Sequence, residues 1–166
     1  MPFRLLSMTA LVLLVVATAA TAKVDQSGWP KVDVNSPQFK KQFGKGGVTY
    51  IGTPLSDKLL GHSGSDKIYG NEAADVIWGD WEPNNSKRQK DLLDGGPGDD
   101  WIYASRGRST ISGGDGNDFI KARDGRGTIS CGPGTDIVKQ SRKRRKNWKI
   151  DRDCEKISYT LDKKQT

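Results

Sequence analysis

One aliphatic residue recurs at every ninth position through the middle of the chain, with a single interruption. Tyr50 occupies the same register one unit earlier. A strand with one inward side chain cannot bury a core alone, but stacked copies of it line a continuous apolar column. The pattern therefore predicts a stack of short parallel strands built around Leu59, Ile68, Ile77, Leu93, Ile102, Ile111, Ile120, Ile129 and Val138.

The polar positions of the unit predict how these strands are connected. Glycine commonly opens the unit and aspartate commonly fills its sixth position, as in GGPGDDWIY at 95–103 and GGDGNDFIK at 113–121. Glycine accepts the left-handed backbone that a tight turn between short strands needs. Two units would form one coil, with strands on opposite walls and turns along two edges. We therefore predict an all-β fold, a parallel β-roll (a right-handed β-helix or solenoid), over residues 48–139.

Alternate units share an edge of such a coil, so their sixth residues form two columns. The first column keeps its aspartates without a gap: Asp57, Asp75, Asp100, Asp118 and Asp136. The second column begins with Asp66 and Asp91 and continues with Ser109 and Gly127. Seven extra residues within 81–90 precede Asp91, and we expect this insertion to form an exposed loop.

A column of carboxylates needs a cation to hold it together. Neighbouring strands lie about 4.8 Å apart, and two carboxylates at that distance repel by about 3 kcal/mol at an effective dielectric near 20. The available ligands are carboxylate and backbone carbonyl oxygens, a donor set that suits Ca²⁺ better than Mg²⁺ or a transition metal. The competing interpretation is that these aspartates only form Asx-turns and bind no metal.

The two complete units, at 95–103 and 113–121, match the nonapeptide G-G-x-G-x-D-x-U-x, and the chain thereby resembles the RTX, or haemolysin-type, calcium-binding repeat proteins. The ending CGPGTDIV, followed by DRDCEKI, is similar to the closing unit of small secreted bacterial members. The resemblance implies Ca²⁺ between turns of one edge, held by sixth-position aspartates and loop carbonyls. It implies ligands Asp57, Asp75, Asp100, Asp118 and Asp136, with Asp66 and Asp91 as further candidates.

The N-terminus predicts export. Arg4 precedes an apolar run at 11–17 and the small residues Ala20-Thr21-Ala22, which is typical of a signal peptide over residues 1–22. The run is too short to span a membrane. We therefore expect a secreted, extracellular protein, in which Cys131 and Cys154 form a disulfide.

The domain organisation follows from these assignments. Residues 23–47 are expected to form an extended leader or N-terminal cap, and Thr49–Ile51 the first strand. Residues 140–166 are expected to form a basic C-terminal cap and tail, with short strands at 148–150 and 156–160 and the disulfide stapling the cap to the last coil.

Charge separates the repeats from the cap. Residues 43–138 carry 11 Lys and Arg against 14 Asp and Glu, whereas residues 139–166 carry 11 against 4. The basic run 142–146 is either a solvated cap loop or a site for an extracellular polyanion or cell-surface polymer. Arg106, Arg108, Arg123 and Arg126 are expected to form a basic edge without metal. No motif indicates sequence-specific nucleic-acid binding, and we expect a monomer.

No pattern in the chain predicts catalysis. Nucleophile elbows, phosphate loops and metalloprotease helices are absent from the sequence. The one histidine, His62, falls where turn residues belong, and the nine-residue period accounts for the aspartates. We therefore expect a protein that is not an enzyme. Trp78, Trp81 and Trp101 are expected to cover a strand wall, with a carbohydrate-stacking patch as the alternative.

Overall fold

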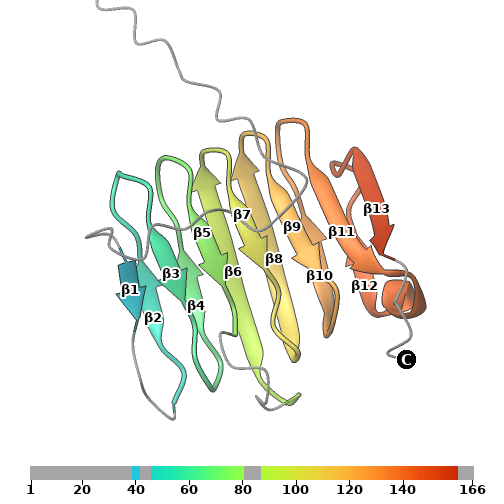
Figure 1. Cartoon of the computed structure of the whole chain (residues 1–166), viewed down its shortest axis with the longest axis horizontal. Coiled ribbons are helices and arrows are strands. Elements are labelled where there is room, and N and C mark those ends of the chain that lie inside the picture. Colours follow the sequence, from blue (N-terminus) through green and yellow to red (C-terminus); the bar gives the residue numbers. More distant parts are fainter. Residues whose placement is uncertain (1–38, 42–45, 81–86, 161–166) are drawn as a thin grey trace, which may run out of the picture.

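The nine-residue period folds into a parallel β-solenoid of about six turns (Figure 1). The computed structural model describes residues 39–41, 46–80 and 87–160. Odd-numbered strands form a seven-stranded sheet: β1 (Phe39–Lys41), β3 (Lys58–Leu60), β5 (Val76–Trp78), β7 (Trp101–Tyr103), β9 (Phe119–Ala122), β11 (Ile137–Ser141) and β13 (Lys156–Thr160). Even-numbered strands form a six-stranded sheet: β2 (Thr49–Ile51), β4 (Lys67–Tyr69), β6 (Lys90–Pro97), β8 (Arg108–Asp115), β10 (Arg126–Ser130) and β12 (Trp148–Ile150). The predicted all-β roll is confirmed.

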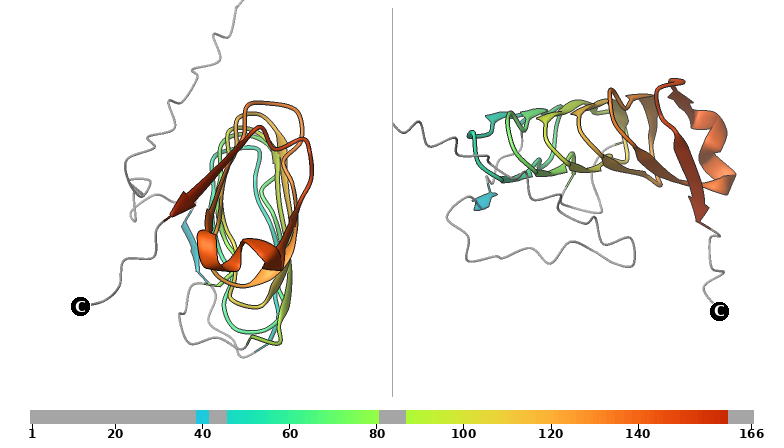
Figure 2. Two further views of the ribbon diagram at one scale, coloured as in Figure 1. Left: turned by 90° about the vertical axis from the view of Figure 1, so that its right-hand side faces the viewer. Right: turned by 90° about the horizontal axis from the view of Figure 1, so that it is seen from above.

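The core is the predicted aliphatic column. In the seven-stranded sheet Ile102 lies in register between Ile77 and Ile120. In the six-stranded sheet Ile111 lies in register between Leu93 and Ile129. All nine predicted aliphatic residues are at most 2% exposed. Viewed along the axis, the coils superpose as a flattened ring whose two long walls are the sheets (Figure 2).

The insertion changes the spacing along the chain but not the stacking of the coils. Ile68 pairs with Leu93, 25 residues later, whereas Ile111 pairs with Ile129, 18 residues later. Residues 81–86 lie outside the described part of the chain. Lys87 and Arg88 are exposed, as predicted for a loop, whereas Lys90 begins β6. Gln89 is buried, and its side-chain amide donates a hydrogen bond to the Asp80 carboxylate.

The ends of the solenoid differ in part from the expectations. β2 and the cap strands β12 and β13 have the predicted bounds, but β1 precedes β2, so Thr49–Ile51 is not the first strand. β1 pairs with β3 at the open end of the seven-stranded sheet. The predicted signal peptide 1–22, most of the leader 23–47 and the tail 161–166 lie outside the described residues.

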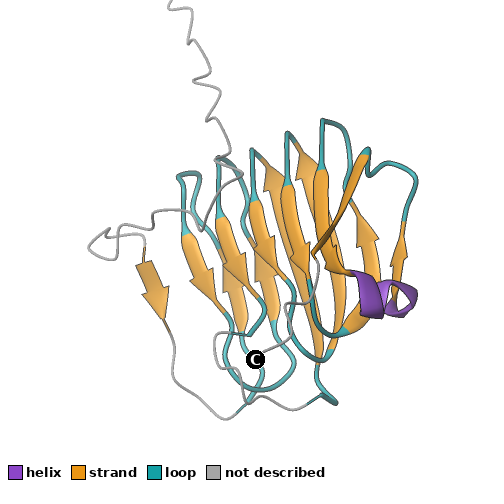
Figure 3. Ribbon diagram, turned by 45° about the vertical axis from the view of Figure 1, so that its right-hand side comes forward, coloured by secondary structure: helices purple, strands orange, loops and turns teal. Residues whose placement is uncertain are grey.

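The basic run forms a short 3-10 helix, η1 (Arg142–Asn147), rather than an irregular loop (Figure 3). It connects β11 to β12, and none of its residues is buried. Among the described residues, no helix has the length and apolar character needed to cross a membrane.

Aromatic side chains cover the outer wall of the seven-stranded sheet. Trp101 and Tyr103 flank the inward-facing Ile102, so they point away from the core, yet each is only 8% exposed. Trp101 packs on Phe119 with ring centroids 4.8 Å apart, and Trp78 packs on Tyr103 at 4.7 Å. Trp78 and Trp101 therefore cover a strand wall, as predicted, while Trp81 lies outside the described residues.

Candidate metal site

The first-column aspartates form one continuous row. Each immediately precedes a strand of the seven-stranded sheet, so stacking of the strands brings their carboxylates into line. The backbone N–H of Asp75 donates to the Oδ1 atom of Asp100 at 2.7 Å, and the N–H of Asp100 donates to Oδ1 of Asp118 at 2.9 Å. The same bond joins Asp57 to Asp75 at 2.6 Å and Asp118 to Asp136 at 2.8 Å. Asp100 and Asp118 therefore lie on one flank of the solenoid.

The row is buried, and several of its oxygens lack a partner. The five side chains are between 0 and 3% exposed. Within the described part of the chain, the Oδ2 atoms of Asp100, Asp118 and Asp136 accept no hydrogen bond. Buried acceptors are normally satisfied, because an unpaired one costs about 1–3 kcal/mol. The row thus presents buried carboxylate oxygens that are available to bind a hydrogen-bond donor or a cation.

The surroundings of the row disfavour negative charge. Burial, followed by the neighbouring carboxylates of Asp118 and Asp75, raises the pKa of Asp100 to about 8. Burial, followed by the carboxylate of Asp136, raises the pKa of Asp118 to about 7. Burial also raises the pKa of Asp136, with Glu155 adding to the effect. A cation among these groups would oppose both causes, because it solvates the carboxylates and cancels their repulsion.

The opening glycines Gly52, Gly70, Gly95 and Gly113 make room for the row, whereas the last unit of the column opens with Cys131. A Cβ atom added at Gly95 would lie 2.2 Å from Oδ2 of Asp100 and 2.2 Å from the carbonyl oxygen of Gly113. A Cβ at Gly113 would likewise lie 2.2 Å from Oδ2 of Asp118. These glycines do not have the left-handed backbone predicted for the turn glycines. They are needed for close approach instead, because any side chain would displace the carboxylate.

The glycines at the second and fourth positions of the unit have the predicted left-handed backbone. Gly96 has φ 94° and Gly114 has φ 115°. In the coil before them, Asn71 (φ 79°) and Ala73 (φ 71°) adopt the same conformation without being glycine. A Cβ at Gly114 would lie 1.9 Å from the carbonyl oxygen of Gly96, so that oxygen points along the stack toward the next coil. The loops that carry the aspartates therefore also present backbone carbonyl oxygens.

The second column forms a shorter row on the opposite edge. The N–H of Val48 donates to Oδ1 of Asp66 at 2.8 Å, and the N–H of Asp66 donates to Oδ1 of Asp91 at 2.9 Å. The insertion has therefore not displaced Asp91, whose pKa is raised to about 7, mainly by burial. In the next coil the hydroxyls of Ser105 and Ser109 pair at 2.8 Å. The carboxylates end after two residues, as the sequence predicted.

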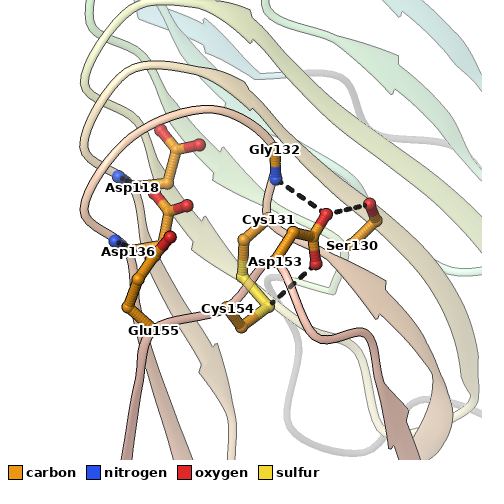
Figure 4. Close-up of a disulfide and its surroundings, with 8 residues drawn as sticks. All are labelled: Asp118, Ser130, Cys131, Gly132, Asp136, Asp153, Cys154 and Glu155. Carbon is orange, nitrogen blue, oxygen red and sulfur yellow. Dashed lines mark hydrogen bonds between the residues drawn. A yellow bond between two sulfur atoms is a disulfide. The ribbon is translucent and has the colours of Figure 1, made fainter.

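The structure adds acidic residues that the repeat pattern did not reveal. Glu155 continues the row beyond Asp136, accepting the Asp136 N–H through Oε2 at 2.8 Å (Figure 4). It stands 19 residues after Asp136. Counting one 18-residue coil from Asp136 would have pointed to Cys154, because the last coil is one residue longer than the others. Asp99 accepts the N–H of Asn117 at 2.7 Å, and Asn117 accepts that of Thr135 at 3.0 Å, which forms an exposed ladder at the fifth position.

The cap closes the row through the predicted disulfide between Cys131 and Cys154, which is present. Beside it, Oδ2 of Asp153 accepts hydrogen bonds from the Ser130 hydroxyl at 2.7 Å and the Gly132 N–H at 3.1 Å (Figure 4). Cys131, Asp153 and Cys154 lie close enough to suggest a metal site. Because both sulfurs are joined in the disulfide, neither offers a thiolate, and the group is structural.

Comparison with known proteins agrees with this geometry. The family model described as the RTX calcium-binding nonapeptide repeat (4 copies) matches residues 51–82 and 94–129. The matched segments contain Asp57, Asp75, Asp100 and Asp118 of the row and Asp66 of the shorter row. No curated protein and no solved structure gives a significant match to the chain.

Proposed function

The chain carries RTX calcium-binding nonapeptide repeats, and on that premise we propose that it is a secreted protein whose solenoid folds around structural calcium ions. The observation that carries the proposal is the buried row in which Oδ2 of Asp100, Asp118 and Asp136 has no hydrogen-bond partner among the described residues. Calcium supplies positive charge and accepts several oxygen ligands in flexible geometry. The donor set of carboxylates and loop carbonyls fits it.

The ligands follow from the two rows. Asp57, Asp75, Asp100, Asp118 and Asp136 hold ions along the longer row, and Asp66 and Asp91 contribute a shorter set on the opposite edge. Beyond Asp91 the second edge continues with Ser109 and Gly127, so ions bind there only near the N-terminal end. Each ion joins loops of successive coils, which explains how calcium stabilises the stack as a whole.

Export and folding are linked in this proposal. Calcium is scarce inside cells and abundant outside them, so a chain exported by the signal peptide 1–22 meets its ion after translocation. Because metal binding that requires the folded state contributes directly to folding, the solenoid forms outside the cell. The protein is not an enzyme in this proposal, since the rows account for its buried carboxylates and no arrangement of nucleophile and base accompanies them in the described part of the chain.

The test is calcium-dependent folding of the mature chain, residues 23–166. Far-ultraviolet circular dichroism and size-exclusion chromatography would be recorded in calcium-depleted buffer and during calcium titration. At pH 8 we expect a compact β-rich state only with calcium. Magnesium at the same concentration should not replace it, because Mg²⁺ prefers strict octahedral sites and retains its waters.

A matched pair of variants separates the row from general acidity. The double variant Asp100→Asn, Asp118→Asn should need at least about tenfold more calcium to fold, because two central ligands lose their charge. The control Asp94→Asn, Asp151→Asn removes the same charge outside both rows and should fold like the parent. A chain equally ordered with and without calcium would show a metal-independent solenoid and refute the proposal.

A further inference from the structure

Three basic side chains hold equivalent positions on the outer wall of the six-stranded sheet. Lys90 in β6 is in register with Arg108 in β8, and Arg108 is in register with Arg126 in β10. All three are exposed. Among the described residues, their side chains make no ion pair or hydrogen bond. Three unneutralised cations are thus aligned across neighbouring strands, about 4.8 Å apart from strand to strand.

This alignment corrects the predicted arginine edge. Of the four arginines expected to lie together, only Arg108 and Arg126 occupy equivalent positions in neighbouring strands. Arg106 and Arg123 precede these strands in the connecting loops. The basic feature therefore lies on the face of the sheet, and Lys90, which the sequence pattern did not single out, belongs to it.

An open hollow of about 220 Å³ lies between the two arginines. Its lining includes Arg108, Arg126, Thr110, Thr128 and Asn147, and no carboxylate. Thr110 and Thr128 are themselves in register and exposed. Two guanidinium groups and two hydroxyls thus surround the hollow with hydrogen-bond donors. Such a set suits a tetrahedral oxyanion, which guanidinium groups bind through paired hydrogen bonds.

The helix η1 extends the basic surface beside the hollow. Asn147 donates from its amide to the carbonyl of Gly125 at 3.3 Å, and Arg144 forms an ion pair with Asp124 at 2.8 Å. These contacts fix η1 against the loop that leads into β10. The other basic side chains of η1 are exposed and form no ion pair within the described part of the chain: Arg142, Lys143, Arg145 and Lys146.

The shape and chemistry of this surface select among polyanions. The outward positions of β8 and β10 are Arg108, Thr110 and Ser112, and Arg126, Thr128 and Ser130. No aromatic ring stands there to stack a nucleic-acid base, which is the usual platform for single strands. On β8 and β10 no apolar side chain points outward to enter a lipid surface, and in β6 the half-buried Leu92 lies beside Thr110. A flat surface of cations and hydroxyls suits a linear, hydroxyl-rich chain that carries negative groups at intervals.

We propose that the outer wall formed by Lys90, Arg108, Arg126 and η1 binds a sulfated polysaccharide, with one sulfate group in the hollow between Arg108 and Arg126. This binding goes beyond calcium-dependent folding and uses a face of the solenoid other than the carboxylate rows. It needs the folded stack, because only stacking of β8 on β10 brings the two arginines together.

The test measures binding to immobilised heparin, as a probe for sulfated polysaccharide, in saturating calcium. The double variant Arg108→Gln, Arg126→Gln should bind at least about tenfold more weakly and show a shallower dependence on salt, because fewer counterions are released. The control Lys139→Gln, Lys156→Gln removes the same charge from the outer wall of the opposite, seven-stranded sheet and should lose less than about threefold. Circular dichroism of each variant in calcium confirms that it is folded, which separates this test from that of the proposed function.

Competing ligands decide the assignment. Heparin stripped of its sulfates should not compete, whereas soluble heparin should compete fully. Equal losses of affinity in the two double variants would show that binding follows net charge alone. That result would overturn the assignment of the hollow as a sulfate site. Tighter binding of single-stranded DNA or of anionic vesicles, lost in Arg108→Gln, Arg126→Gln, would overturn the polysaccharide as the ligand. A parent protein that is folded but does not bind heparin would overturn the proposal altogether.

Discussion

Gly95 shows how one residue type serves two purposes within a single turn. Its backbone is not left-handed, yet the space that a Cβ would occupy is filled by the carboxylate of Asp100 and the carbonyl of Gly113. Gly96, the next residue, has φ 94°, and glycine is favoured there because of this left-handed backbone conformation. The consecutive glycines of the unit are therefore not interchangeable, and the first one protects the candidate metal site.

The substitution Gly95→Ala should lower the free energy of unfolding by about 1–3 kcal/mol, the usual cost of overpacking a tight site. It should also weaken calcium binding, because the new methyl group pushes on Oδ2 of Asp100. Chemical denaturation in saturating calcium measures the first effect, and calcium titration the second. The control is Gly46→Ala, where nothing lies within 4 Å of the added atom. Equal stability of the two variants would contradict the steric argument.

The raised pKa values in the row predict how the calcium-free protein responds to pH. The pKa is about 8 for Asp100 and about 7 for Asp118, whereas an aspartate in an unfolded chain has a pKa of about 3.9. The folded state therefore binds more protons than the unfolded state above pH 4. The stability from these protonated carboxylates is complete below about pH 4 and is lost as the pH rises through about 7 to 8.

In calcium-depleted buffer we therefore expect more folded chain at pH 5 than at pH 8, measured by circular dichroism. Saturating calcium should remove this dependence, because the ion then compensates the ionised carboxylates. The double variant Asp100→Asn, Asp118→Asn should respond less to pH than the parent. A calcium-free protein that becomes more ordered between pH 5 and pH 8 would have the opposite sign and refute the argument.

The insertion shows how a strand pair tolerates a change in loop length. Ile68 and Leu93 pair in the same parallel register as the strands of the uninterrupted coils, so the seven extra residues leave the strand pairing unchanged. Removing residues 81–87 would leave GDRQKDLLD, a nine-residue unit with Asp91 in sixth place. Stacked coils require the strand register to be preserved. A shift of the register by an odd number of residues would turn the core side chains outward.

Deletion of residues 81–87 should preserve the fold and its calcium dependence. The free energy of unfolding should change by less than about 1 kcal/mol, because loop closure depends weakly on loop length. Chemical denaturation in calcium measures the change. Deletion of residues 95–101 removes the same number of residues from the end of β6, the following turn and the start of β7 and should prevent folding. If the first deletion unfolds the chain, the inserted segment is a structural element and not an added loop.

The whole molecule is a one-dimensional stack, in which each coil contacts its neighbours through backbone ladders and shared carboxylates. A change in the middle weakens two interfaces, whereas a change at an end weakens one. Asp100 accepts a hydrogen bond from Asp75 of the preceding coil and donates one to Asp118 of the next. The carboxylate of Asp57 bonds within its own turn, to the N–H and hydroxyl of Thr53.

Asp100→Asn should therefore raise the calcium concentration at the folding midpoint more than Asp57→Asn does. We expect roughly a tenfold shift for the central substitution and less than about threefold for the terminal one, as nearest-neighbour stacking predicts. A calcium titration followed by circular dichroism measures both midpoints. Equal shifts would indicate that the sites bind independently and do not transmit stability along the stack.

Much of the molecule follows from the period alone, because two units close one coil and every coil repeats the same register. The aliphatic core, both aspartate columns and the end of the second column after Asp91 were predictable for this reason. The cap strands were predictable from alternation, and the Cys131–Cys154 disulfide from cysteine pairing in a chain predicted to be exported. The left-handed glycines were predictable only at the second and fourth positions of the unit.

The remaining features depend on contacts between segments that do not share the period. Pairing of β1 with β3 and extension of the row by Glu155 arise where non-repetitive segments cover the ends of the solenoid. Burial of Asp100 between neighbouring coils determines its pKa, and stacking of β8 on β10 brings Arg108 beside Arg126. Local sequence determines the turn and the side that each residue faces. Only the assembled stack determines which charges are buried together and which meet on the surface, because burial and proximity depend on the neighbouring coils.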